Sequence, residues 1–232
     1  MTGNSFKHSE RIERLLGDIP LEPLSSKHLD DIAKLHYRLL PWSFNGQFGE
    51  AHIVDLYKAL GQSPNFFGYV YYRNGQLLGF VTATTDYRNT RKHLLGVYRK
   101  KVFKMLSIFL RHPTYFLAAL ESRFLVPRIF YRYKTRAEWL TFVTDTRTGT
   151  LGPLVAMRLI AAVRQHFFSA GVGCYMAQGF KDNPPAMRMY EKLGWRIVAT
   201  LPMHNIYHYP TGVDSVDIQM QQKPGEEAAH VR

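Results

Sequence analysis

The stretch Asn-Pro-Pro-Ala-Met-Arg-Met-Tyr-Glu-Lys-Leu-Gly-Trp, residues 183–195, decides the fold of this chain. Its residue types predict a short helix. Asn183 is a favourable N-cap, Pro184 is tolerated at the first helical position, and Gly194 is typical of a helix end. The apolar residues recur three and four positions apart and therefore share one face of this helix: Ala186, Met187, Tyr190 and Leu193.

The spacing inside this stretch is more specific than a capped helix requires. The pattern Asn-x-x-Ala-x-x-x-Tyr-Glu-Lys-Leu-Gly-aromatic resembles the C-terminal motif of the GNAT superfamily of acyl-CoA-dependent N-acetyltransferases, with Trp195 where Phe is commonest. The resemblance implies that Asn183, Ala186 and the helix start lie along the pantetheine arm of acetyl-CoA. It also implies that the Tyr190 hydroxyl protonates the leaving thiolate.

Length and composition limit the class of protein. A chain of 232 residues with 46% apolar residues suits one globular domain with an insertion. The single Cys174 excludes a disulfide framework and a cysteine-rich zinc site, and no metal is expected. The polar N-terminus lacks a signal-sequence pattern, and no apolar run reaches the roughly 18 residues of a spanning helix. These features predict a cytoplasmic protein, soluble or peripherally attached to a membrane.

The order of the expected elements agrees with the resemblance. Asn74-Gly75 between two β-rich runs is a strong hairpin signal, and it follows an edge strand and two helices. A last hairpin is expected to pair 196–203 with 216–220 across a turn at 209–212. The predicted fold is α/β and GNAT-like, a mixed, mostly antiparallel sheet of about seven strands with helices on both faces. The predicted parts are an N-terminal arm at 1–19, the domain at 20–220 and a polar tail at 221–232.

A glycine-bearing loop follows the expected strand 137–144 and leads into a helix. Such a strand, loop and helix N-terminus form a generic site for phosphate. In GNAT proteins the loop reads Gln/Arg-x-x-Gly-x-Gly/Ala and holds the coenzyme A pyrophosphate. Here Thr150 stands where the middle glycine belongs. The resemblance assigns to cofactor binding Phe142, Val143, Thr144, Arg147, Thr148, Gly149, Thr150 and Gly152.

An amine must lose a proton during acetyl transfer, so the reaction requires a general base. Glu138 is the first candidate, because GNAT proteins often have a carboxylate on the corresponding strand. Asp86 is the second candidate and is also assigned to the acceptor side. His204 and His208 come third. The loop at 41–49 is expected to line the acceptor side through its three large aromatic residues: Trp42, Phe44 and Phe48.

The segment 88–136 is an insertion relative to a minimal GNAT domain, and all of the net charge of +12 lies there. It contains 13 basic residues and one acid, Glu121. An apolar stripe from Leu95 to Phe109 predicts a basic amphipathic helix. Such a helix can lie on anionic lipid, bind an acidic partner or cover the core with its charges outward. Nucleic acid is not expected as a partner, because no recognition motif accompanies the basic residues.

The function predicted from the sequence is transfer of an acetyl group from acetyl-CoA to a primary amine. The basic insertion disfavours polycationic acceptors and favours a small amine such as a nucleotide-linked amino sugar or another envelope-glycan precursor. The alternative is a non-catalytic GNAT-fold module that acts through the insertion at a membrane or an acidic partner. The sequence leaves the oligomeric state open.

Overall fold

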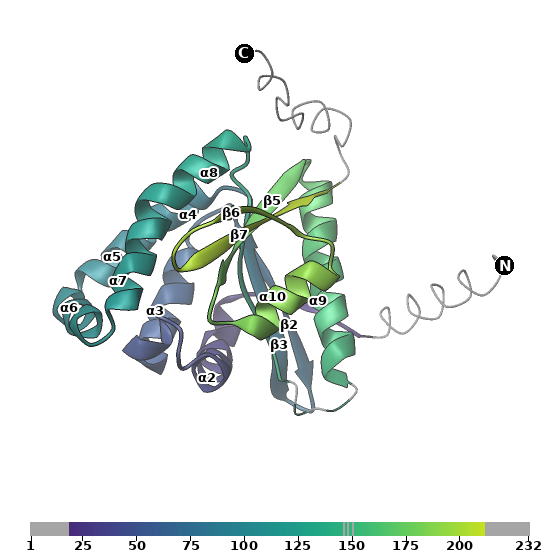
Figure 1. Ribbon diagram of the computed structural model, residues 1–232. Helices are drawn as coiled ribbons and strands as arrows, with labels where there is room; N and C mark the ends of the chain where they lie inside the picture. Colours follow the sequence, from purple (N-terminus) through teal and green to yellow (C-terminus); the bar gives the residue numbers. More distant parts are fainter. Residues whose placement is uncertain (1–18, 146, 148, 150, 212–232) are drawn as a thin grey trace, which may run out of the picture.

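A computed structural model describes residues 19–145, 147, 149 and 151–211. In this part of the chain, one mixed sheet has the strand order β1-β2-β3-β4-β5-β7-β6, with helices on both faces (Figure 1). This architecture confirms the predicted α/β class. The strands are β1 (Glu22–Pro23), β2 (Phe66–Arg73), β3 (Gln76–Thr84), β4 (Glu138–Thr144), β5 (Cys174–Phe180), β6 (Arg196–Thr200) and β7 (His204–Pro210).

None of the helices of the described residues has the length and apolar character needed to cross a bilayer. They are α2 (Leu29–Leu39), α3 (Glu50–Leu60), α4 (Tyr87–Lys92), α5 (Leu94–Arg99), α6 (Val102–Arg111), α7 (Pro113–Leu120), α8 (Val126–Arg132), α9 (Leu151–Ser169) and α10 (Pro184–Lys192). Shorter turns are the 3₁₀-helices η1 (Ser26–His28) and η2 (Gly46–Phe48) and the π-helical turn η3 (Glu121–Leu125).

The β2–β3 hairpin is the one that the sequence predicts. Asn74 and Gly75 have φ angles of 51° and 74°. Two successive positive φ values are what a type I′ turn requires, and its twist matches that of the flanking strands. β1 adds an edge strand to β2, as expected for its proline-containing sequence.

The two central strands, β4 and β5, run parallel and separate soon after they begin. They pair only at Glu138–Met176 and Trp139–Ala177. On its other edge β4 contains one extra residue, Leu140, because Thr82 pairs with Thr141 and Ala83 with Trp139. Bulges bend the strand that contains them. The bulge therefore coincides with the point at which β4 leaves β5.

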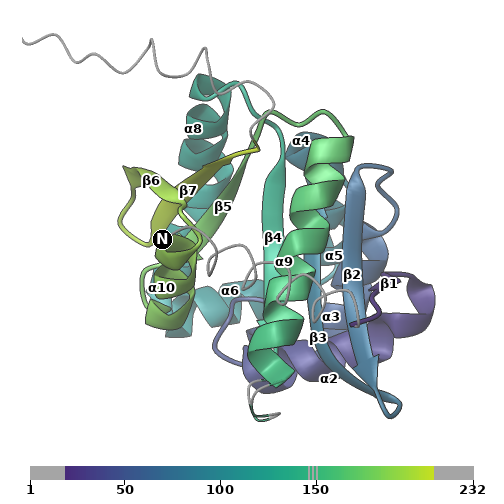
Figure 2. The same ribbon diagram turned by 90° about the vertical axis from the view of Figure 1, so that its right-hand side faces the viewer.

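Each face of the sheet has its own apolar core. On one face α9 and α10 cover a cluster that includes Trp139, Leu159 and Tyr175 (Figure 2). On the other face α2 and α3 cover the N-terminal half of the sheet. The helices between β3 and β4 cover its C-terminal half on that same face, where Phe130 and Met176 are buried together.

Some expectations about element boundaries need correction or lie outside the described residues. The last hairpin turns at Leu201–Met203, where Pro202 interrupts the strands, and His204–Pro210 is its second strand. The run Arg128–Lys134, for which the sequence predicts no particular element, is mostly helix α8, since Pro127 occupies the tolerated first turn. Of the expected arm at 1–19 only Ile19 is described, and the segment 216–220 and the tail at 221–232 lie outside the described residues.

Candidate active site

The separation of β4 and β5 opens a cleft with a volume of about 550 Å³. Beyond Trp139, the edge of β4 that faces β5 has no partner strand within the described part of the chain. The walls come from β4, the end of β5, α10, the end of α2 and the loop that follows α2. They include Leu140, Thr141, Phe142, Val143 and Thr144 of β4, Gln178, Gly179 and Phe180 of β5, and Asn183, Ala186 and Tyr190 at α10.

The motif helix α10 begins and ends as its sequence predicts. The Asn183 side chain accepts a hydrogen bond of 3.3 Å from the Ala186 N–H, and prolines occupy the first two helical positions. Gly194 has a φ angle of 78°, the left-handed conformation that closes a helix. Asn183 and Ala186 both line the cleft. The motif thus brings the start of α10 to the cleft wall.

Tyr190 lies at the inner end of the cleft. Its side chain is 7% exposed, and its ring centroid lies 4.5 Å from that of Tyr207 and 5.1 Å from that of Trp195. Burial, with a smaller contribution from Tyr207, raises the pKa of the Tyr190 hydroxyl. The phenol is therefore protonated at neutral pH and can donate a proton.

Gly179 on β5 makes room for these rings, a role that no local pattern in the sequence indicates. A Cβ at position 179 would lie 2.7 Å from the Tyr207 ring and 3.4 Å from the Tyr190 ring. The first distance is too short for a carbon–carbon contact. A side chain here would displace the tyrosines, so a glycine is needed where the backbone of β5 approaches them.

The loop after β4 is held by a buried carboxylate. Asp145 is 2% exposed and accepts hydrogen bonds from the Arg147 guanidinium, at 3.0 and 2.8 Å, and from Arg38, at 2.6 Å. The Arg147 hydrogen bonds are the largest cause that lowers the pKa of Asp145 to about 2. Arg147 thus braces the loop that leads to α9, while its side chain stays largely exposed.

The remaining predicted loop residues divide into two groups. Gly149 has a φ angle of 65°, which glycine adopts without strain, and Gly152 is buried in the first turn of α9. Thr148 and Thr150 lie outside the described residues.

Glu138, the first candidate for the base, is not part of the cleft wall. It is 2% exposed, and its carboxylate binds one Arg91 nitrogen at 3.0 and 3.2 Å. The Gln178 side-chain amide donates to the same carboxylate, and Gln178 does line the cleft. Glu138 therefore joins the helical insertion to the two central strands.

The other candidate bases also have structural partners. Asp86 caps α4 by accepting from the Arg88 and Asn89 N–H groups, at 2.9 and 3.2 Å. His204 is buried beside Glu121, with 2.8 Å between Nδ1 and the carboxylate. His208 is buried against the Tyr133 ring. None of these three lines the described cleft.

His36, a buried residue of α2 that the sequence analysis does not name as a site residue, lies in the cleft wall. Its Nδ1 lies 3.0 Å from the Tyr57 hydroxyl, and its Nε2 lies 3.3 Å from Ser43 Oγ. Burial, with a smaller contribution from His52, lowers the pKa of His36 to about 4. Of the described residues that line the cleft, only His36 and Tyr190 have ionisable side chains. A histidine within an apolar stripe was the available signal.

The aromatic residues of the loop after α2 contact two different parts of the protein, the cleft and the insertion. Trp42 lines the cleft. Phe44 instead stacks on Phe109 of α6, and Phe48 is buried against the His52 ring. Phe44 and Phe48, which the sequence assigns to the acceptor side, do not line this cleft, because aromatic residues of the insertion pack against them.

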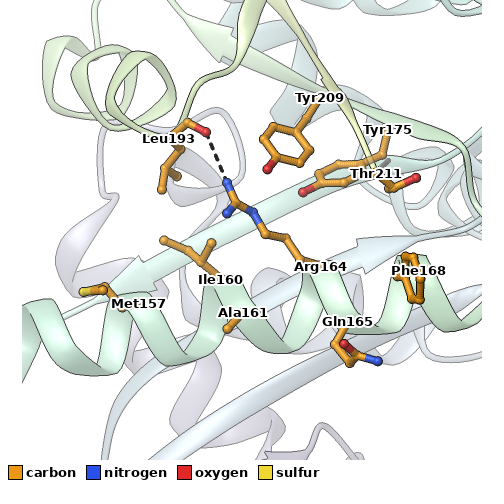
Figure 3. A pocket seen from close by; sticks show the side chains of 10 residues that line it. All are labelled: Met157, Ile160, Ala161, Arg164, Gln165, Phe168, Tyr175, Leu193, Tyr209 and Thr211. Atoms are coloured by element: carbon orange, nitrogen blue, oxygen red, sulfur yellow. Dashed lines mark hydrogen bonds between the residues drawn. The ribbon is translucent and has the colours of Figure 1, made fainter. Parts of the chain in front are cut away.

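A second pocket, of about 470 Å³, lies between α9, the end of α10 and β7 (Figure 3). Arg164 reaches across it, donates a 3.2 Å hydrogen bond to the Leu193 carbonyl and lies 4.4 Å from the Tyr209 ring centroid. A cation beside the last carbonyls of a helix is favourable. Arg164 therefore fixes the end of α10 to α9, which supports the position of Tyr190.

The sheet order, the separation of β4 and β5, and the position of α10 can be compared with known structures. No family model and no curated protein matches the chain. An N-acetyltransferase from Staphylococcus aureus Mu50 matches with a TM-score of 0.52 and 10% identity, over 84% of this chain and 99% of its own. The PaiA N-acetyltransferase from Thermoplasma acidophilum, in complex with coenzyme A, matches with a TM-score of 0.51 and 10% identity, over 83% and 99%.

The chain has the GNAT fold. In both comparisons nearly the whole of the solved chain is covered. At 10% identity the likeness concerns the fold. Within the described residues, no cluster of three or more His, Cys, Asp or Glu side chains could hold a metal ion.

Proposed function

We propose that this protein transfers an acetyl group from acetyl-CoA to a primary amine. The single observation that carries the proposal is the cleft at the divergence of β4 and β5, with Tyr190 at its inner end. Acetyl-CoA would supply an acyl group that is activated by a thiol leaving group. The free edge of β4 can hydrogen-bond to an extended amide-containing chain in the manner of an added strand.

The residues present are compatible with coenzyme A. Thr141–Thr144 of β4 and the start of α10 would hold the pantetheine arm. The first turn of α9 would receive the pyrophosphate, because unpaired N–H groups at a helix start favour phosphate. Arg147 adds a positive charge next to this turn, and its side chain is 65% exposed.

Tyr190 would act as the general acid. It would donate its proton to the sulfur as the C–S bond breaks. Burial raises the pKa of the Tyr190 hydroxyl, so the phenol is present in the proton-donating form. The ring contacts with Tyr207 and Trp195 fix its direction.

We propose His36 as the base that accepts the amine proton. The Ser43 hydroxyl oxygen lies 3.3 Å from His36 Nε2. The imidazole is neutral above about pH 5, because burial lowers the pKa of His36 to about 4. A neutral imidazole can accept the proton that the nitrogen loses as the new C–N bond forms. Glu138 would keep a positioning role, since it holds Gln178 at the cleft wall.

The acceptor class follows from the charge of the site. Among its described residues the cleft wall contains no carboxylate, and the helical segment beside it is strongly basic. We propose a small amine that carries negative charge elsewhere, such as a phosphorylated amino sugar or another glycan precursor. Like charges disfavour polycationic acceptors.

Two measurements on the full chain test this function. Acetyl-CoA at about one hundred times its Kd should raise the free energy of unfolding by about 2.7 kcal/mol. With anionic amino sugars, thiol release should then depend on both substrates. If acetyl-CoA stabilises the protein but no amine causes thiol release, the protein binds the cofactor and the proposed transfer reaction is wrong. Absence of both would favour the non-catalytic alternative.

A further inference from the structure

The helices between β3 and β4 present large apolar side chains to solvent. Of the 16 large hydrophobic residues that are exposed in the described chain, 11 lie between Leu95 and Tyr131, so exposure is concentrated in one segment. Phe103 is 87% exposed and Leu110 is 78% exposed. We call this surface the insertion face. It consists of Leu95, Val102, Phe103, Leu106, Leu110, Phe116, Leu117, Leu120, Phe124, Leu125 and Tyr131.

The insertion face is a product of helices that are apolar on two sides. In α6 the inward side is formed by Met105, Ile108 and Phe109, while Phe103 and Leu110 point away from the core. The sequence predicts one apolar stripe that includes Val102 and Leu106, but both side chains are exposed. A helix that only covers a core has a polar outer side. The outer side of α6 therefore needs another explanation.

The same arrangement continues along the next helices. α7, η3 and α8 follow one another without a break. Leu117, Leu120, Phe124 and Tyr131 recur at helical spacing and are exposed. Figure 1 shows these helices and α5 and α6 on the side of the molecule opposite α9, and Figure 2 agrees.

The single acid of the segment is turned away from this surface. The π-helical turn η3 places Glu121 inside, where it is 4% exposed and accepts a 2.8 Å hydrogen bond from the Met203 N–H. It also lies 2.8 Å from His204. The exposed charges between 88 and 136 are therefore all basic.

Some of the basic residues are used inside the protein and others are not. Lys101 pairs with Asp55 at 2.8 Å, and Lys104 donates to the Phe48 carbonyl. Exposed arginines that form no ion pair within the described residues lie beside the insertion face. Arg111 follows Leu110 in the chain, and the Arg123 guanidinium lies 5.7 Å from the Phe124 ring centroid. The others are Arg99 and Arg128.

We propose that the insertion face docks the protein on an anionic lipid surface. Apolar side chains that enter the acyl boundary, flanked by arginines that meet lipid phosphates, are the two components of an interfacial contact. A second copy of the chain fits less well. A twofold interface would set the same arginines against each other, which is unfavourable.

Vesicle co-sedimentation of the full chain tests the proposal. The protein should pellet with phosphatidylcholine vesicles that contain about one third phosphatidylglycerol, and not with phosphatidylcholine alone. High salt should weaken the binding because it screens the arginine contribution. A parent protein that stays in the supernatant with both kinds of vesicle would overturn the proposal.

Two sets of variants separate the components. Phe103→Ser with Leu110→Ser should weaken binding at least about tenfold. The matched control, Phe168→Ser with Ile197→Ser, changes equally apolar side chains that are exposed on other elements, at 55% and 46%, and should bind as the parent does. All four side chains are exposed, so the variants should fold, as circular dichroism would verify. Equal binding of the Phe103/Leu110 variant would contradict docking through this face.

The charge variant is Arg99→Gln, Arg111→Gln and Arg123→Gln. Its affinity for the anionic vesicles should fall by about a hundredfold, since each basic side chain near the surface increases the affinity by about fivefold. Most of the salt dependence of binding should also be lost. Lys34→Gln, Arg73→Gln and Arg196→Gln remove the same charge elsewhere and should have little effect. If sedimentation instead shows a dimer that Phe103→Ser dissociates, without lipid binding, the face joins two copies and the proposal is wrong.

Discussion

The Phe44 ring lies nearly parallel to the Phe109 ring, with 5.5 Å between centroids and 11° between planes. This contact joins the loop at the cleft to helix α6. The Tyr115 hydroxyl adds a hydrogen bond to the Trp42 carbonyl of the same loop. The position of Trp42 in the cleft wall therefore depends on the helical insertion.

Phe44→Ala should raise the acceptor KM and leave the acetyl-CoA Kd nearly unchanged. The loss of ring contacts with Phe48, Tyr98, Phe109 and Tyr115 should also lower the free energy of unfolding by about 2–4 kcal/mol. Steady-state kinetics and urea denaturation measure the two effects. Phe168→Ala, at a 55% exposed position, is the control and should change neither. An unchanged acceptor KM would show that the loop that contains Phe44 does not contribute to acceptor binding.

Tyr190→Phe should lower kcat by about 10²–10⁴ because the variant lacks the proton donor, while acetyl-CoA affinity stays the same. Tyr207→Phe is the matched control. Its ring packs against Tyr190, and the substitution removes the same kind of hydroxyl group from the neighbouring ring. Thiol-release kinetics and calorimetry provide the readouts. Equal kcat in both variants would assign Tyr190 to packing.

Glu138→Gln should chiefly affect stability. Removing the carboxylate charge leaves Arg91, whose side chain is 29% exposed, without its ionic partner, and should cost about 2–4 kcal/mol. Asp55→Asn breaks the more exposed pair with Lys101 and should cost less than about 1 kcal/mol. Denaturant unfolding measures both. If the folded Glu138→Gln protein loses more than a hundredfold in kcat while His36→Gln does not, Glu138 and not His36 is the base.

Arg147→Glu should weaken acetyl-CoA binding without abolishing folding. The substitution places a second carboxylate next to Asp145 and reverses the charge beside the first turn of α9. Arg196→Glu makes the same charge change on the edge strand β6 and is the control. Titration calorimetry compares the two Kd values. Equal affinities would mean that backbone groups alone hold the phosphates.

The free energy of unfolding should fall as the pH falls from about 6.5 to 4. Burial is the main cause that lowers the pKa of both His36 and His52 to about 4, below the unfolded value near 6.5. In this window the unfolded state binds more protons, so acid favours unfolding by up to about 1.4 kcal/mol per pH unit for each residue. Asp145 titrates lower, near 2.

Urea denaturation at several pH values checks this dependence. His52→Gln should have a smaller slope than the parent between pH 6.5 and 4. His112→Gln, at an exposed position, is the control and should keep the parent slope. A parent protein whose stability is constant over this range would show that folding holds neither His36 nor His52 neutral.

Features with a local cause could be predicted from the sequence. The Asn74-Gly75 turn, the Asn183 cap and the Gly194 helix end each depend on residues within a few positions. The core faces of α2 and α10 follow from apolar spacing, and both are confirmed. The order of these elements along the chain was sufficient to predict the fold.

Features that depend on distant partners could not be predicted. Glu138 has the residue type and strand position of a base, but Arg91 reaches it from 47 residues away in the chain. Phe44 has the composition of a binding residue, but Phe109 covers it. The last hairpin was misplaced because Tyr209-Pro210-Thr211-Gly212 and Leu201-Pro202-Met203 both contain turn residues. Only tertiary contacts distinguish these alternatives.

The absence of a carboxylate from the described cleft wall has a consequence for selectivity. An ammonium ion that entered would lose its hydration without gaining a counter-ion, which is costly. A neutral amine has no comparable desolvation cost. Weakly basic nitrogens, which are largely deprotonated at neutral pH, would therefore be modified faster than lysine-like ones. Under the proposed function, the basicity of the acceptor nitrogen would therefore contribute to selectivity in addition to the shape of the acceptor.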